Sequence, residues 1–226
     1  MALVSTAIQY QDKQTLRPKL AEVCRLRGLV EHNDWHNDDP LRQSLRLVRW
    51  VKRLPASLVE IVDAPVAVWS SHLNSVPDPA AGQHTVRALL TFAALIHDVG
   101  KAETFQRLPD GATRCPGHEA VSARMAPILC ARFDFTLVET GFISNIVEAH
   151  GEPYALFKKV ASFPTFQQQE QIHGVEVEHA DYVLPLMLLA CGDLVTSHLA
   201  TIRPEKYQAV FKFYQVWLHR LGSRAS

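Results

Sequence analysis

An almost uninterrupted apolar run, residues 89–96, ends directly in the ionisable pair His97-Asp98, and Gly100 and Lys101 follow closely. A run of this composition predicts a helix that is buried nearly all round and that Gly100 ends. Burying two ionisable groups costs free energy unless a charge compensates them, and a bound cation is one such compensator. This segment therefore predicts a core helix with a candidate metal site at its carboxyl end.

Apolar residues recur at helical spacing through most of the remaining chain. We expect helices at about 16–30, 41–54, 57–72 with an interruption at Pro65, 80–100, 116–129, 135–150, 180–200 and 204–221. Pro109-Asp110-Gly111 is a turn signal and predicts a short hairpin within 105–116. The glutamine-rich stretch 163–179 has no clear period and predicts a long loop or a lid near a site. The expected fold class is all-α.

The 226 residues are enough for one compact helical bundle with a self-sufficient core. We expect that core at about 66–200, with N-terminal helices at 16–54 and a C-terminal helix at 204–221 packed on it. The aromatic residues of this last helix are expected to belong to the core rather than to a dimer surface, and both a monomer and a homodimer stay open.

Composition excludes several classes of protein. The four cysteines contain no Cys-x-x-Cys pair, which indicates reduced thiols rather than a disulfide framework or a zinc knuckle. The most apolar segment, 183–191, is about half as long as a membrane span, so we expect a cytoplasmic protein without a membrane partner. The 23 basic and 23 acidic residues balance, and this balance does not support RNA binding.

One face of the helix expected at 41–54 carries arginines at helical spacing, opposite an apolar stripe. They are Arg42, Arg46, Arg49 and Arg53. Such a face could cradle phosphate groups or contact RNA, but a charged stripe opposite an apolar one is more often solvated surface. We therefore interpret it as surface.

Six imidazole or carboxylate groups stand at or near expected helix ends. They are His72, His97, Asp98, His118, His150 and Asp193. Imidazole and carboxylate ligands without thiolate suit Mn, Fe, Ni, Mg-like or Zn ions in a site that keeps positions open for water or a phosphate oxygen. Each histidine alone is more often an ordinary residue, so the prediction depends on the whole set.

Together, the order of His72, His97-Asp98, Gly100-Lys101 and Asp193 resembles the HD-domain metal-dependent phosphohydrolases. With Asp110-Gly111 and the run from Gly117-His118-Glu119 to Ala123, residues 66–200 look most like the HD domain of bacterial CCA-adding tRNA nucleotidyltransferases. The nucleotide-polymerising head of those enzymes is not expected, because no Gly-Ser run with paired aspartates precedes residue 66. The resemblance implies a single all-α HD domain.

The resemblance also implies the ligands of the site. A first metal would be held by His72, His97, Asp98 and Asp193, while His118 and His150 would complete a second metal position or contact the phosphate. His84 is an alternative to His72. We favour His72 because the span to His97 leaves room for a turn, whereas His84 would lie more than three turns earlier on the same helix. The chain has Ala149-His150 where many family members have a His-His pair.

The activity implied is a phosphohydrolase that cleaves a phosphomonoester or phosphodiester, with a nucleotide as the expected small phosphorylated substrate. One or two divalent ions (Mn, Fe, Ni, Co, Zn or Mg) would activate water. Among the catalytic residues Asp98, Lys101, His118 and His150, Lys101 would neutralise phosphoryl charge and a histidine would protonate the leaving oxygen. The alternative is a non-catalytic HD module that binds a nucleotide or RNA.

Overall fold

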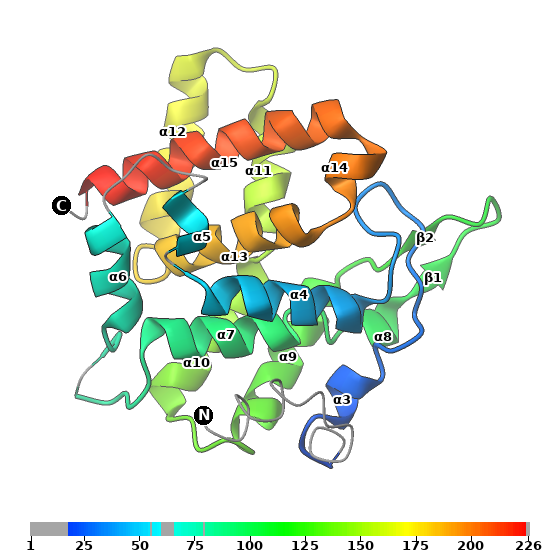
Figure 1. Cartoon of the computed structure of the whole chain (residues 1–226), viewed down its shortest axis with the longest axis horizontal. Helices are drawn as coiled ribbons and strands as arrows, with labels where there is room; N and C mark the ends of the chain where they lie inside the picture. Colours follow the sequence, from blue (N-terminus) through cyan, green and yellow to red (C-terminus); the bar gives the residue numbers. More distant parts are fainter. Residues whose placement is uncertain (1–17, 55, 60–65, 79, 225–226) are drawn as a thin grey trace.

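The apolar run forms α7 (Val86–Ile96), which lies at the centre of the computed structural model of the chain (Figure 1). Thr85 begins this helix, because its side chain accepts a hydrogen bond from the main-chain N–H of Ala88. Residues 89–96 are all buried, and α7 contacts four neighbours, α4, α6, α10 and α13. The predicted core helix is therefore confirmed, but the Thr85 cap moves its start from residue 80 to Val86.

The structure describes residues 18–54, 56–59, 66–78 and 80–224, and the element labels follow Figure 1. The longer helices besides α7 are α4 (Pro40–Lys52), α6 (Val66–Asn74), α9 (His118–Cys130), α10 (Leu137–Ala149), α11 (Glu152–Val160), α12 (Thr165–Glu178), α13 (Val183–Thr196) and α15 (Pro204–Arg224). The single-turn helices are α3 (Ala21–Cys24), α5 (Ala56–Val59), α8 (Lys101–Thr104) and α14 (Leu199–Ile202).

A small antiparallel hairpin, β1 (Gln106–Arg107) with β2 (Thr113–Arg114), projects from the helical body (Figure 1). It encloses the Pro109-Asp110-Gly111 turn, and Gly111 has φ +84° there, so the predicted hairpin is confirmed. Since every other element of the described residues is a helix, the all-α fold class is confirmed as well.

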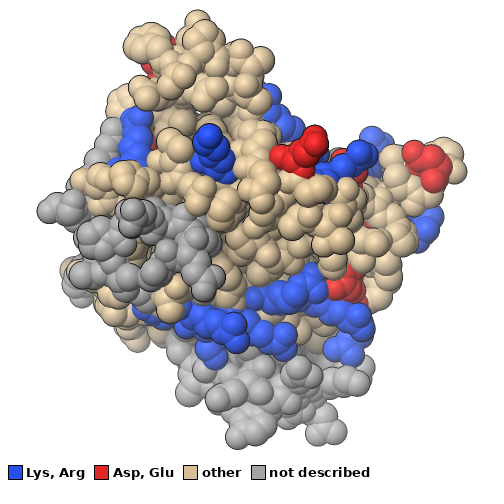
Figure 2. Space-filling model, turned by 45° about the horizontal axis from the view of Figure 1, so that its top comes forward, with Lys and Arg blue, Asp and Glu red and all other residues tan. Residues whose placement is uncertain are grey.

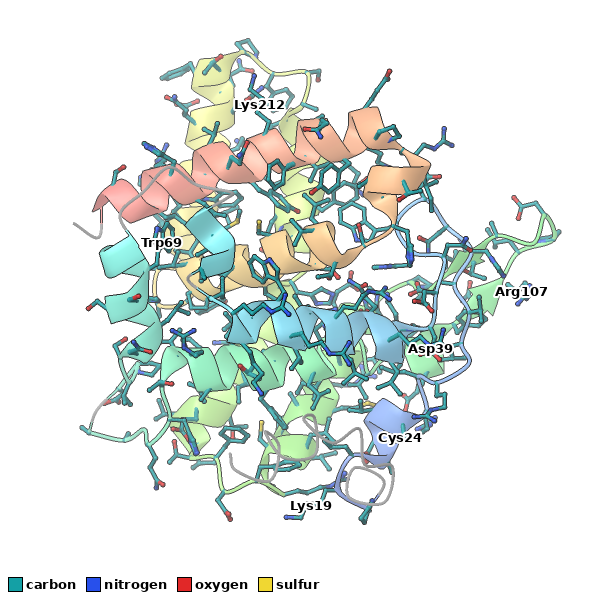
Figure 3. All side chains as sticks on the ribbon, viewed as in Figure 1. Lys19, Cys24, Asp39, Trp69, Arg107 and Lys212 are labelled. Carbon is teal, nitrogen blue, oxygen red and sulfur yellow. The ribbon has the colours of Figure 1, made fainter. Side chains whose placement is uncertain are left out.

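Helix α4 lies between α7 and α13. It starts at Asp39, labelled in Figure 3, whose carboxylate accepts hydrogen bonds from the main-chain N–H groups of Leu41 and Arg42. Apolar residues of α4 face the core, while basic residues cover its outer face. Figure 2 shows lysine and arginine side chains as a band across this side of the molecule. Arg42, Arg49 and Arg53 are exposed, as the interpretation of a solvated surface requires, whereas Arg46 is half-buried and donates to Asp38, Gln43 and the Thr196 carbonyl.

Helix α15 covers α13 and α14. Its residues Val210, Tyr214, Trp217 and Leu218 are buried, so this face of the aromatic helix belongs to the core, as expected. None of the helices in the described part of the chain is both long enough and apolar enough to span a bilayer.

The structure differs from the sequence prediction over residues 152–178. The stretch 163–179 is not a loop, because most of it forms α12, a helix with a narrow buried face around Ile172 that contacts α11. Glutamine favours helices, so this helix forms without a broad apolar period. Helix α11 was missed because Pro153 suggested a helix end, whereas it stands in the first turn of α11, where proline is tolerated.

Two further helix boundaries were wrong. The helix predicted at 180–200 is divided at Ser197, which is extended, and α14 follows. The helix predicted at 16–30 is not continuous: among the described residues, 18–19 and α3 are helical, Leu20 lies between them, and turns follow from Arg25. The helix predicted at 57–72 corresponds to α5 and α6, and residues 60–65 between them lie outside the described residues.

Candidate metal centre

Three helix ends meet at the carboxyl end of α7. His97 caps α7 and Asp98 follows it, His118 is the first residue of α9, and His150 caps α10. The Nε2 atom of His118 lies 3.2 Å from Asp98 Oδ1, and that of His150 lies 3.8 Å from the same oxygen. The Nε2 atom of His97 lies 3.3 Å from Asp98 Oδ2. Asp98 is thus surrounded by three imidazole rings.

Each of the three rings is oriented in the same way by its own main chain. Nδ1 lies within hydrogen-bond distance of the carbonyl oxygen three residues earlier in the chain. These contacts are 3.0 Å from His97 to Ala94, 2.8 Å from His118 to Cys115 and 2.7 Å from His150 to Val147. Because a carbonyl can only accept, Nδ1 carries the proton, and a neutral ring then presents the lone pair of Nε2 to Asp98.

Lone pairs on three nitrogens and a carboxylate repel one another unless a proton or a metal ion lies between them. Histidine ligands of metals typically donate their other ring N–H to a carbonyl or a carboxylate in this way. One ligand atom each from His97, Asp98 and His150 lies within 4.8 Å of the others, which is close enough for a shared ion. The donor set, imidazole and carboxylate without thiolate, therefore fits a divalent metal.

The ionisation of these groups follows from their mutual charges. Burial alone would raise the pKa of Asp98, but the neighbouring His97 and Lys101 hold it well below its usual range. Burial opposes protonation of His97 and His118, yet the Asp98 carboxylate raises the pKa of both. Burial and the two charged rings beside it lower the pKa of His150 to about 4. Without a metal, protons on two of the rings would supply the positive charge that Asp98 requires.

Lys101 adds a fixed positive charge on the other side of Asp98. Its Nζ lies 2.9 Å from Asp98 Oδ2 and 3.0 Å from Glu31 Oε2, and both carboxylates raise the pKa of Lys101 against the effect of burial. Burial raises the pKa of Glu31 although Lys101 opposes this. The ammonium group that the sequence assigned to a phosphoryl oxygen is therefore held by two protein carboxylates.

Asp193 of α13 stands at the edge of the cluster, with its Oδ1 atom 3.8 Å from His97 Nε2. Its carboxylate accepts hydrogen bonds from Gln43 Nε2 at 2.8 Å and from Trp35 Nε1 at 3.2 Å. Burial would raise the pKa of Asp193, but the contact with His97 lowers it. Asp193 thus lies close to the His97-Asp98 pair in the structure, although it is nearly a hundred positions further along the chain.

His72 and His84 lie elsewhere, at the amino end of α7. His72 lies in α6. Directly after α6, the main-chain carbonyl of Ser75 accepts a hydrogen bond from the N–H of Val86, the first residue of α7. His84 contacts Glu139. From Val86 to His97 the helix rises by about 16 Å, at 1.5 Å for each residue. The geometry therefore corrects the expectation that His72 lies beside Asp98, because the turn after α6 returns the chain to the start of α7 rather than to its end.

His36, in the loop before α4, lies near enough to the cluster to be affected by its charges. It is buried, and its Nδ1 atom has no hydrogen-bond partner among the described residues. Burial and, next, Lys101 lower its pKa to about 3, while the charges of Asp193 and Asp98 oppose this change. Its ring is not part of the group of ligand atoms that lie within 4.8 Å of one another. Sequence reasoning missed His36, Trp35 and Gln43, because nothing in the local pattern separates them from an ordinary polar loop and an ordinary helix face.

Two glycines permit this close packing. Gly117 has φ +68° directly before His118, a conformation that side chains other than glycine rarely adopt. A Cβ atom on Gly100 would collide with the main chain of α9 at His118 and, at 2.7 Å, at Ser122. Gly100 also donates its main-chain N–H to the Ser122 hydroxyl at 2.9 Å. These contacts fix the start of α9, and with it His118, against the Asp98 turn.

A buried His–Asp cluster at the meeting point of several helix ends defines this chain as a helical domain with a candidate metal centre. The HD domain family matches residues 70–185, more than half of the 226 residues, and the chain belongs to that family. The matched range contains His97, Asp98, His118 and His150, whereas His36 and Asp193 lie outside it. HD domains are typically metal-dependent hydrolases. None of the curated proteins compared with the chain matches it.

Proposed function

We propose that this protein is a metal-dependent phosphohydrolase that cleaves a phosphomonoester or phosphodiester of a nucleotide. The observation that supports the proposal is the convergence on Asp98 of three histidines whose Nδ1 atoms face main-chain carbonyls. The nucleotide part rests on the likeness of the runs at 95–101 and 117–123 to the HD domain of CCA-adding enzymes.

In this proposal, the position of each residue in the cluster determines whether it binds the metal ion or donates a proton. His97, Asp98 and His150 would hold the ion, with Asp193 beside them. A divalent ion bound there would polarise a water molecule and a phosphoryl oxygen. The His118 side chain is more exposed than that of His97, so His118 is the ring that we assign to protonation of the leaving oxygen.

Lys101 acts in this proposal mainly through Asp98. Its ammonium group neutralises that carboxylate and orients it towards the rings. It would reach a phosphoryl oxygen, as the sequence suggested, only if Glu31 released it. We therefore propose Lys101 as a positioning residue.

A non-catalytic HD module that binds a nucleotide remains the second candidate, because the cluster is nearly closed. His97 and Asp98 are each 1% exposed and Lys101 is 4% exposed, which leaves a substrate little surface to contact. A metal in so closed a site would stabilise the fold without turnover.

The test is to load the purified protein with Mn, Ni, Co, Zn, Fe or Mg, to measure bound metal, and to screen phosphomonoesters, phosphodiesters and cyclic nucleotides for hydrolysis. We expect about one or two ions per chain and turnover of a nucleotide. Asp98→Asn should weaken metal binding at least about a hundredfold, since it removes the charge that all three rings face. Asp110→Asn, on the exposed hairpin turn, is the matched control and should change neither quantity.

The outcomes separate the candidates. Stoichiometric metal without hydrolysis of any compound favours the binding module. A protein that takes up none of the six metals contradicts the proposed metal-dependent hydrolase. Hydrolysis that survives in Asp98→Asn would place the chemistry outside this cluster.

A further inference from the structure

A cavity of about 500 Å³ lies at the amino end of α7, away from the His–Asp cluster. Its lining includes Val86 of α7, Phe142 and Asn145 of α10, and Asp181 and Tyr182 at the start of α13. The cluster lies at the other ends of the same three helices, at His97, His150 and Asp193. Along α7 the cavity and the candidate metal centre lie roughly 16 Å apart, whereas along α10 Asn145 of the lining lies about 7.5 Å before His150.

The charges around this cavity are negative. Asp78 and Asp181 line it, and none of the lining residues that the structure describes is a lysine or arginine. Asp181 is exposed and makes no ion pair within the part of the chain that the structure describes. Burial and then the carboxylates of Glu152, Glu178, Glu148 and Asp181 raise the pKa of Tyr182. A phosphate or carboxylate ligand would be repelled here, whereas a cation would be attracted.

The hydrogen-bonding groups that line the cavity also favour a ligand that donates hydrogen bonds. Burial lowers the pKa of His72, so its ring is neutral, and its Nε2 atom has no hydrogen-bond partner among the described residues. One oxygen of Asp78 accepts the main-chain N–H of Ala80, and the other can accept a further donor. The side-chain carbonyl of Asn145 is a further acceptor in the lining. Among the described residues, the obligate acceptors of the lining are thus the carboxylates of Asp78 and Asp181, beside a partly apolar surface at Phe142.

We propose that this cavity is a second binding site, for a small organic cation: a primary amine or guanidinium group on a short apolar body. The apolar part would pack on Phe142 and the valines of the lining, and the cationic group would lie between Asp78 and Asp181. The site is independent of the chemistry at Asp98, because it shares no residue with the cluster.

The test uses three probes of nearly equal shape, phenethylamine, 2-phenylethanol and phenylacetate, titrated into the full chain and followed by two-dimensional NMR. The amine should shift the resonances of residues that line the cavity and bind at least about threefold more tightly than the alcohol, on the scale of one solvated ion pair. Phenylacetate should bind most weakly. Equal binding of the amine and the acid, or shifts confined to other surfaces, would overturn the proposal.

Two variants with matched controls connect the binding to the cavity. Gly141 lies in α10 at the cavity, and a Cβ atom added there meets nothing within 4 Å, so Gly141→Leu should occupy the cavity without a clash. Gly174 of α12 is also a helix glycine with nothing within 4 Å of an added Cβ, and Gly174→Leu is its control. We expect Gly141→Leu to weaken amine binding at least about tenfold, and Gly174→Leu to leave it unchanged, with folding retained in both because leucine favours helices.

The second pair tests the charge. Asp181→Asn should weaken binding of the amine by about threefold and leave that of the alcohol unchanged, while Asp110→Asn should affect neither. If Asp181→Asn weakens the alcohol as much as the amine, the cavity does not select for charge and the assignment to a cation fails. Binding of the amine that persists in Gly141→Leu would place the probe outside this cavity.

Discussion

The two ends of α7 carry the same types of side chain in opposite chemical settings. At the amino end, the buried carboxylate of Glu139 accepts from main-chain N–H groups of Gln83 at 2.6 Å, His84 at 2.5 Å and Thr136 at 3.0 Å. Nδ1 of His84 lies 3.0 Å from both oxygens of the same carboxylate. Every atom that faces Glu139 can donate a proton, so the carboxylate is satisfied by the protein alone.

At the carboxyl end, Asp98 faces three Nε2 atoms whose rings have used their Nδ1 protons on carbonyl oxygens. The protein alone satisfies this carboxylate only through Lys101 or by protonating the rings. The difference teaches that a His–carboxylate pair indicates a metal site only when the ring nitrogen facing the carboxylate lacks a proton. In a neutral ring, the nitrogen that faces the carboxylate lacks a proton when the other nitrogen donates its proton to a carbonyl oxygen.

The largest effect that this comparison predicts is on stability at Glu139. Glu139→Ala leaves the buried N–H groups of Gln83 and His84 without acceptors, and should lower the free energy of unfolding by about 3–5 kcal/mol. Urea unfolding measures this loss. Glu170→Ala, an exposed position on α12, should stay within about 0.5 kcal/mol of the unchanged protein.

Metal analysis of the same variant supplies the second half of this test. Glu139→Ala should bind as much metal as the unchanged protein, provided that it is folded under the conditions used. A loss of stability below about 1 kcal/mol, or a loss of metal in a folded Glu139→Ala sample, would mean that the two ends of α7 do not differ as described.

The second prediction concerns pH. Burial alone would raise the pKa of Glu139, but the hydrogen bonds from Thr136, Gln83 and His84 lower it from 4.5 to about 2. Because the pKa is lower in the folded state, the ionised carboxylate stabilises the fold fully above pH ~5, and this contribution disappears as the pH falls towards 2. Its full size is at most about 3 kcal/mol.

The measurement compares Glu139→Gln with the unchanged protein by urea unfolding at pH 7, 5 and 3. Glutamine cannot ionise, so the difference in unfolding free energy between the two proteins should be largest at pH 7 and should shrink by pH 3. A difference that stays constant over this range would show that the charge of Glu139 contributes nothing.

Sequence reasoning found what local chemistry determines. The apolar run predicted α7 and its burial, and the residues that follow it predicted a polar cluster at its end. His118 and His150 could be proposed because each directly follows or precedes a glycine at a helix end. These features depend on helix periodicity and on glycine, which act within a few residues of the chain.

Sequence reasoning failed where long-range contacts decide the path of the chain. The loop before α4 brings His36 near the cluster because distant residues hold it: Glu31 pairs with Lys101, Trp35 packs on Tyr154 with ring centroids 4.5 Å apart, and Asp34 contacts Arg203 at 3.3 Å. No periodic pattern within the loop encodes these contacts. His72 was preferred on spacing alone, and spacing does not specify to which end of a helix the chain returns.

Asp193 shares features of both carboxylates, Glu139 and Asp98. The prediction for it is the smallest of the three and concerns metal affinity. It accepts N–H donors from Trp35 and Gln43, as Glu139 does from its neighbours, yet it also approaches His97. If it is a metal ligand, Trp35→Phe removes a hydrogen bond that orients it while keeping an aromatic ring against Tyr154. Metal affinity, measured by competition with a chelator, should then fall about tenfold.

Trp69→Phe is the matched control, because the indole Nε1 of Trp69 has no hydrogen-bond partner among the residues that the structure describes and lies in α6. It should change metal affinity by less than about twofold, although the smaller ring will lower stability, since Trp69 is buried. Should Trp35→Phe lower stability as Trp69→Phe does and leave metal affinity unchanged, Asp193 would belong with Glu139 as a structural carboxylate, and the ion would rest on His97, Asp98 and His150 alone.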